Sequence, residues 1–388
     1  MNSKKLWIIS IPAIIMMSMS IFLWSQTSQT AASDTLGHTS FGEFARSSTS
    51  SIASCPLFPA NNIWNYNISH LPVIPNSANY IASIGITSKL HAAFGSTIPG
   101  YPPPGMPYVV VPATQPYVPV HFYYAKESTP GPYPIPPNVP VEGGRQNPGD
   151  RHVIVVNSDT CKLYEMWASY PQPDGSWKAG GGSMWSLKSN SLRPKYWTSA
   201  DAAGLPILPG LVRYDEVETG VINHALRVAV NHTQRAFLWP ARHFASTDSS
   251  TNLPPMGLRL RLKAGVDISS FSPQNQVILT ALKHYGVFVA DNSDLNSLEL
   301  SGARTPGDHW NNSSLAFLGN LHASDFEAVD ESALQVSPNS GQVASPQQAH
   351  QPIHNPINNG IAFPTTLCNQ SCSPELVAVL QKQSLLNG

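Results

Sequence analysis

Residues able to do acid–base chemistry gather in one short stretch of the chain. Asp215 and Glu216 supply carboxylates, His224 supplies an imidazole, and Arg213 and Arg227 supply cations. A carboxylate and an imidazole that meet in a cleft can exchange protons with a substrate. Two such groups about 5–9.5 Å apart flank the scissile bond in glycoside hydrolases. The stretch favours general acid–base catalysis on a glycosidic or uronate substrate, with the arginines binding substrate.

The same residues also have a purely structural interpretation. Asp215 and Glu216 suit the first turn of a helix, where the helix dipole favours negative charge. Arg213 or Arg227 can pair with them on the surface. Both interpretations stay open at this point.

The candidate site also includes four residues that lie later in the chain. His243 is a third candidate acid or base, and Trp239 precedes it by four positions. Asp291 follows the apolar run 287–290, and the ends of buried strands often face a cleft. Trp239, Asp291 and Trp310 are therefore candidate substrate-binding residues.

Tryptophans are natural sugar-binding platforms, because a flat ring covers the apolar face of a pyranose. Core packing is the alternative for each of them. We expect Trp177 and Trp197, which lie in polar, turn-rich contexts, to be the exposed ones. The candidates are Trp64, Trp167, Trp177, Trp185, Trp197, Trp239 and Trp310.

Several common chemistries are excluded because their motifs are absent from the sequence. The sequence has no GxSxG, HExxH or GxxxxGK[ST] motif, and no GxGxxG follows a strand. The run 180–182, three glycines, predicts a bulge or a flexible loop. The histidines lack the spacing of a known metal site, so we predict neither a metal nor another cofactor.

Charged residues make up 12% of the chain, and the net charge is -1. No cluster of Lys and Arg follows Lys5, so a nucleic-acid partner is not expected. A surface of Ser, Thr, Asn, Gly and Pro suits an extracellular setting and a polysaccharide or cell-wall glycan as partner. Nothing in the sequence indicates an oligomeric state.

The N-terminus predicts export from the cytoplasm. Lys4 and Lys5 precede an uncharged, mostly apolar run over residues 6–24. Its length lies between that of a signal peptide and the roughly 20 residues of a membrane-spanning helix. We expect an extracytoplasmic protein, with segment 1–24 either a cleaved signal peptide or a membrane anchor.

Composition predicts the domain boundaries. A Ser/Thr-rich linker over 25–54 is expected to be disordered, and one β-rich domain follows over 55–335. A low-complexity linker covers 336–366, and a tail with a CxxxC pair and a helix covers 367–388.

Four cysteines, at positions 55, 161, 368 and 372, allow three pairings. In an exported chain we favour Cys55 with Cys161 and Cys368 with Cys372. The alternative is buried or unpaired thiols.

Secondary-structure patterns predict a mainly β fold. Residues 151–157 and 161–167 are β-rich and flank a polar turn, which predicts a hairpin. Ser272 and Pro273 begin the clearest helix, which stops at Gly286, and a shorter helix is expected from Asp215 to Gly220. We predict a β-sandwich or jelly-roll-like domain with one or two packed helices. Further strands are expected at 107–113, 117–125, 183–187, 224–230, 257–263 and 286–290.

Several stretches resemble a group of uncharacterised secreted bacterial proteins. The resemblance covers about residues 55–330 and supports one domain there. It implies no activity, because none is established for the group. The matching runs are 133–137, 142–144, 150–153, 161–165, 198–217, 224–227, 239–243 and 254–257.

The sequence thus leads to two functional hypotheses. The first is an exported polysaccharide-active enzyme, a glycoside hydrolase or a polysaccharide lyase. The second is a non-catalytic surface protein that binds carbohydrate or cell wall. In the second the aromatic residues matter and the acid–base groups do not.

Overall fold

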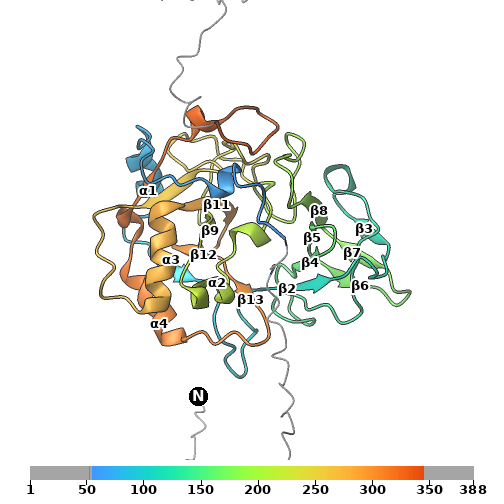
Figure 1. Ribbon diagram of the computed structural model, residues 1–388. Helices are drawn as coiled ribbons and strands as arrows, with labels where there is room; N and C mark the ends of the chain where they lie inside the picture. The colour runs from blue at the N-terminus through green and yellow to red at the C-terminus, as the bar shows by residue number, and fades with distance from the viewer. Residues whose placement is uncertain (1–51, 53–54, 345–388) are drawn as a thin grey trace, which may run out of the picture. The chain divides into compact units, whose positions relative to one another are not determined.

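The computed structural model describes residue 52 and residues 55–344 (Figure 1). The predicted export segment, the tail and most of both predicted linkers lie outside these residues, as do Cys368 and Cys372. The described part is mainly β-structure with few helices, which confirms the predicted class. Its sheets mix parallel and antiparallel pairs, so a sandwich or jelly-roll arrangement stays a prediction.

The largest sheet has six strands in the order β1-β12-β9-β11-β10-β14. Its two central strands, β9 and β11, run parallel, and their residues 226–230 and 287–290 are almost entirely buried. Strands covered on both faces carry continuous apolar runs, as these do. The strands are β1 (Lys89–Ala92), β9 (Leu226–Val230), β10 (Arg259–Leu262), β11 (Val287–Asn292), β12 (Ser297–Leu300) and β14 (Phe326–Ala328).

A five-stranded sheet, β13-β2-β4-β5-β8, separates two apolar cores. Alternate side chains of its strand β4 point to opposite faces. Ile154 and Val156 join the main core, whereas Val153 and Val155 join a smaller second core. The strands are β2 (Met106–Val111), β4 (Val153–Asn157), β5 (Lys162–Trp167), β8 (Gly181–Ser186) and β13 (Ala303–Arg304).

The predicted hairpin is confirmed as the antiparallel pair β4 and β5. Its turn is closed by the Asn157 side chain, whose Oδ1 accepts hydrogen bonds from the backbone and hydroxyl of Thr160.

A three-stranded sheet, β3-β7-β6, contributes to the second core and lies at the right of Figure 1. It consists of β3 (Val120–Phe122), β6 (Tyr170–Pro171) and β7 (Trp177–Ala179).

Four α-helices lie in the described part, two more than predicted. The helix α3 (Pro273–His284) begins as expected, since the Ser272 hydroxyl accepts from the backbone N–H of Asn275. The helix α2 (Tyr214–Thr219) ends at Gly220, which has a φ of 88° and caps it. The unpredicted helices are α1 (Ser77–Ile84) and α4 (Asn312–Ala316). Among residues 55–344, none of the helices has both the length and the apolar character needed to cross a membrane.

The folded part continues past the predicted boundary at residue 335. Trp239 donates a hydrogen bond to the Ser340 carbonyl, and Arg242 donates to the Pro338 carbonyl. Val343 and Ala344 are buried. Composition alone missed this segment because its order comes from contacts with distant side chains.

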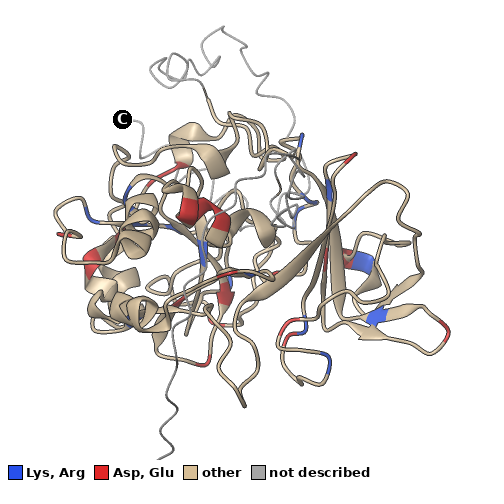
Figure 2. Cartoon of the chain, turned by 60° about the horizontal axis from the view of Figure 1, so that its bottom comes forward, with Lys and Arg blue, Asp and Glu red and all other residues tan. Residues whose placement is uncertain are grey.

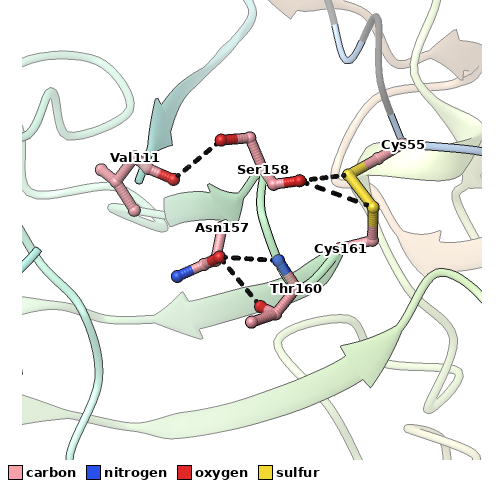
Figure 3. The surroundings of a disulfide bond; sticks show 6 residues. All are labelled: Cys55, Val111, Asn157, Ser158, Thr160 and Cys161. Atoms are coloured by element: carbon pink, nitrogen blue, oxygen red, sulfur yellow. Dashed lines mark hydrogen bonds between the residues drawn. A yellow bond between two sulfur atoms is a disulfide. The ribbon is translucent and has the colours of Figure 1, made fainter. Parts of the chain in front are cut away.

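The predicted Cys55–Cys161 disulfide is present, with the two Cα atoms 5.4 Å apart. Figure 3 shows it beside the hairpin turn, where the Ser158 carbonyl approaches both sulfur atoms. The bond joins residues 106 positions apart and ties the start of the described domain to the five-stranded sheet.

Removing this disulfide should destabilise the domain. A Cys55→Ala/Cys161→Ala double variant frees a long loop in the unfolded chain, so we expect a loss of about 2–4 kcal/mol in the free energy of unfolding. Urea denaturation of both proteins measures it. A reductant should lower the midpoint of the wild type much more than that of the variant; equal sensitivity would contradict the assignment.

Candidate functional site

A cleft with a volume of about 390 Å³ brings together polar and aromatic side chains from the six-stranded sheet, the five-stranded sheet and the connecting loops. Two of the predicted site residues, Asp291 and His243, line the cleft. A third, Arg227, does not line it but contacts Asp291 from behind. The lining residues are Tyr124, Glu127, Asp150, Trp167, Gly181, Thr198, Ser199, Ala200, Asp201, Ala202, His243, Ala245 and Asp291.

Asp291 reaches the cleft because it ends the buried run of β11. The register between β11 and β9 shifts between Val289 and Asp291, and such irregularities re-aim side chains near functional sites. The Asp291 side chain is 33% exposed, and its Oδ1 accepts from the backbone N–H of Asn292. The expectation that a strand-end carboxylate faces a cleft is met.

Arg227, on the neighbouring strand β9, holds a second carboxylate behind Asp291. Its Nη2 lies 2.7 Å from Oδ2 of Asp201 and 3.7 Å from Oδ2 of Asp291, and its Nη1 donates to the Ser301 hydroxyl. The Arg227 side chain is only 2% exposed. It therefore orders two carboxylates and is not itself free to bind a charged substrate.

The two carboxylates differ in environment. Asp201 is buried, and its Oδ1 also accepts from the backbone N–H of Ala203. Burial, together with the nearby charge of Asp201, raises the pKa of Asp291 to about 6, against the opposing effect of Arg227. A carboxyl group with such a pKa carries its proton in mildly acidic solution, as a general acid requires.

His243 presents a basic nitrogen to the same cleft. Its Nδ1 lies 2.8 Å from the Ala202 carbonyl, which can only accept, so the proton of the neutral ring sits on Nδ1. Its Nε2 is then an acceptor and lies 4.0 Å from Glu127. The ring is 26% exposed, so the structure places a candidate base and a candidate acid in one cleft.

One loop positions both groups. The carbonyl of Ala203 accepts from the backbone N–H groups of Arg242 and His243. The backbone N–H of Ala203 donates in turn to the Ala290 carbonyl of β11. The loop that carries Asp201 therefore links His243 to the end of β11.

Two aromatic rings wall the cleft. The rings of Tyr124 and Trp167 are 6.5 Å apart between centroids and inclined by 31°. Trp167 donates from Nε1 to Asp150, and its ring lies so close to Gly180 that a Cβ there would come within 2.3 Å of it. The glycine run is thus a strand edge that accommodates a ring, and the predicted bulge or flexible loop is wrong.

Behind the cleft floor, His152 forms a buried ion pair with Glu142. Its Nδ1 lies 2.5 Å from Glu142, and its Nε2 lies 2.9 Å from the Ala200 carbonyl. Burial would lower the pKa of His152, but Glu142 outweighs it and raises this pKa to about 9. Burial would likewise raise the pKa of Glu142, and the His152 charge holds it below the usual value.

Glu142, Asp150 and His152 have potential ligand atoms within 4.8 Å of one another. A metal needs a neutral imidazole with a free lone pair. Both ring nitrogens of His152 already face acceptors, so the ring donates from both. We therefore interpret this group as an ion pair.

Of the remaining acid–base candidates, Glu216 and His224 line a second hollow of about 580 Å³ together with Arg213. Glu216 and His224 do meet, with Nε2 3.1 Å from the carboxylate, and Arg213 lies 2.6 Å from Glu216 and 3.4 Å from Asp215.

In this second hollow the groups satisfy one another. His224 is almost completely buried and its Nδ1 also faces the Ala225 carbonyl. Burial would raise the pKa of Glu216, but His224 and Arg213 hold it below its usual value. Glu216 is thus an ionised carboxylate held by Arg213 and His224, which agrees with the structural interpretation in which an arginine pairs with it.

The tryptophans are distributed differently from expectation. Trp310 is buried, with its ring against Phe94 and Tyr214, which leaves no face for a sugar. Trp239 is half-buried, and its Nε1 donates a hydrogen bond to the Ser340 carbonyl. Trp177, expected to be exposed, is buried in the second core, because it pairs in the three-stranded sheet.

Sequence reasoning missed Asp201, Tyr124 and Glu127 as parts of one site. Asp201 lies in a loop of small residues without any periodic pattern, and Tyr124 follows a strand of three residues. The one available signal was a Ser-x-Asp turn, in which the Ser199 hydroxyl accepts from the backbone of Asp201. That signal is common in loops.

Comparisons of the chain with protein-family models, with curated proteins and with solved structures gave no match.

The His152–Glu142 pair predicts a specific pH dependence of stability. The His152→Gln variant should lose roughly 2–3 kcal/mol of the free energy of unfolding. Because the folded-state pKa of His152 is raised from 6.5 to about 9, the stabilisation is fully present just below pH 6.5 and declines as the pH rises through 9. Denaturation of wild type and variant between pH 5.5 and about 9.5 tests this; a constant difference would contradict it.

Proposed function

We propose that the protein is an exported polysaccharide-active enzyme, and specifically a glycoside hydrolase. The single observation that carries the proposal is Asp291, a cleft-facing carboxyl with a raised pKa backed by the Arg227–Asp201 ion pair. Perturbed carboxyls in clefts are candidate catalytic acids. The aromatic walls beside it suit a sugar ring.

In this proposal Asp291 is the general acid. Its carboxyl donates a proton to the glycosidic oxygen as the bond to the anomeric carbon breaks, and Asp291 is left ionised beside Arg227. Nε2 of His243 takes a proton from the attacking water, whose oxygen bonds to the anomeric carbon. Proton exchange with solvent then restores both groups.

A hydrolase fits better than a lyase, for reasons of charge. A lyase removes the proton beside a uronate carboxylate and needs an accessible cation to neutralise that carboxylate. Neither Lys nor Arg is among the described residues lining the cleft, and Arg227 and Arg213 are buried and paired. The lyase and the predicted role of the arginines in binding substrate charge are thus less favoured.

The Cys55–Cys161 disulfide supports an extracytoplasmic location, because such bonds persist in oxidising compartments. We propose that segment 1–24 directs export or tethers the protein to the membrane. The sparse charge of the described domain, scattered in Figure 2, suits a glycan partner.

The second candidate is a non-catalytic carbohydrate-binding protein. The paired rings of Tyr124 and Trp167 favour it, since they would bind sugar without any acid or base. The two candidates differ in whether Asp291 matters for turnover.

Replacing Asp291 by Asn should abolish most glycan hydrolysis. Loss of a general acid typically costs about 10²–10⁴-fold in rate. Reducing-sugar release from a panel of plant and microbial polysaccharides measures it, and Glu216→Gln is the matched variant from the second hollow. Activity that survives in Asp291→Asn but is lost in a folded Glu216→Gln would move the site to Glu216 and His224. Binding without turnover by the wild type would favour the non-catalytic candidate.

The pH profile should show the same group. Because Asp291 must be protonated to act, kcat/KM should fall as the pH rises through about 6. Initial rates at constant ionic strength from pH 4 to 9 test this. A rate that rises throughout this range would contradict the assignment of Asp291 as the acid.

A further inference from the structure

An aromatic strip extends from the cleft onto the neighbouring surface. It consists of Trp167, Tyr124 and Tyr123, of which the first two line the cleft. Tyr123, which precedes Tyr124 in the chain, lies outside the cleft lining. Its ring centroid is 4.8 Å from that of Tyr124, and the two rings are inclined by 88°. Tyr123 is 82% exposed.

The strip is held on rigid backbone. The backbone N–H of Tyr123 donates to the Ala179 carbonyl, and that of Tyr124 donates to the Gly180 carbonyl. These bonds continue the pairing of β3 with β7, near the right edge of Figure 1. A recognition surface on sheet-like backbone needs little ordering when a ligand binds. The backbone that carries Tyr123 is thus hydrogen-bonded in place, while its ring is exposed beside the cleft.

The charges beside the strip define its ligand. Glu127 and Asp150 line the cleft next to Tyr124 and Trp167, and carboxylates accept hydrogen bonds from sugar hydroxyls while repelling anions. Rings and carboxylates that line the same cleft suit a ligand with apolar ring faces and hydroxyl edges. An aliphatic surface of a partner protein would offer no hydroxyl groups to these carboxylates.

We propose that the aromatic strip is a subsite for a linear, uncharged polysaccharide whose chain runs out of the cleft over Tyr123. The inference deepens the proposed function and rests on it: the enzyme would hold its substrate on units beyond the scissile bond and act within polymers. Binding energy from such remote units helps to position the reacting bond.

The test compares polymer and short substrates. The probes are soluble xylan, glucomannan and hydroxyethyl cellulose, and the polymer that the parent protein binds is used for the comparison. Tyr123→Ala should weaken binding of that polymer by roughly tenfold, as expected for the loss of one stacking contact. Tyr123→Phe, which keeps the ring, should bind within about twofold of the parent. Binding is measured by affinity electrophoresis and calorimetry in the full-length Asp291→Asn protein, which should leave the polymer intact.

Tyr101→Ala is the matched control, because Tyr101 is 71% exposed and lines a different cavity. Polymer binding equal in Tyr123→Ala and Tyr101→Ala would overturn the inference, and so would failure of all three polymers to bind. On an aryl glycoside, whose single sugar stays in the cleft, Tyr123→Ala without the Asp291 change should keep kcat/KM within about twofold.

The two proposals can fail separately. Strip-dependent binding without hydrolysis by the wild type would support the subsite and reject the catalytic assignment. Hydrolysis that depends on Asp291 but not on Tyr123 would do the reverse. A strong preference for polygalacturonate over the neutral polymers would overturn the inferred ligand class.

Discussion

The guanidinium of Arg227, buried inside the six-stranded sheet, is the constraint on which the candidate site depends. An isolated buried charge is costly, so a paired carboxylate has to lie within reach. Asp201 meets this need from a loop 26 residues earlier in the chain, and Ser301 supplies a further acceptor. The ion pair between Arg227 and Asp201 then fixes the loop whose residues Ala202 and Ala203 hydrogen-bond to His243. Of the two carboxyls near Arg227, Asp291 is the more exposed.

The five-stranded sheet provides the opposite wall through the same strand alternation that builds its two cores. Because β5 ends at Trp167 after a fully buried stretch, the indole emerges where the sheet borders the cleft. Glu165, two residues earlier, is completely buried and accepts from the backbone N–H groups of Ile207 and Leu208. This carboxylate anchors the chain between the Asp201 loop and β9, so sheet and loop are ordered together.

Glu216 and His224 show how similar residues can serve different ends. Both hollows contain a carboxylate and an imidazole, and in both an arginine contacts the carboxylate. At Glu216 the His224 imidazole and the Arg213 guanidinium contact one carboxylate and hold its pKa below the usual value. At Asp291 two carboxylates share one cation, and burial raises the pKa into the range of an acid catalyst. The net effect of burial and charged partners on each carboxyl, and not the residue types, separates a structural ion cluster from a candidate catalytic one.

The sequence by itself determined the local features: the hairpin, the Ser272-Pro273 helix start, the mainly β class and the Cys55–Cys161 pair. Each depends on residues near one another or, for the cysteines, on a choice among few pairings. It also marked Asp291, since a polar residue after a buried run is a local signal. Only the tertiary structure decided that Asp291 shares a cleft with His243 and Asp201, that Glu216 belongs to another hollow, and that Trp167 is a wall while Trp177 and Trp310 are core. These contacts join loops far apart in sequence, and the pKa values follow from burial and charge balance that no spacing rule contains.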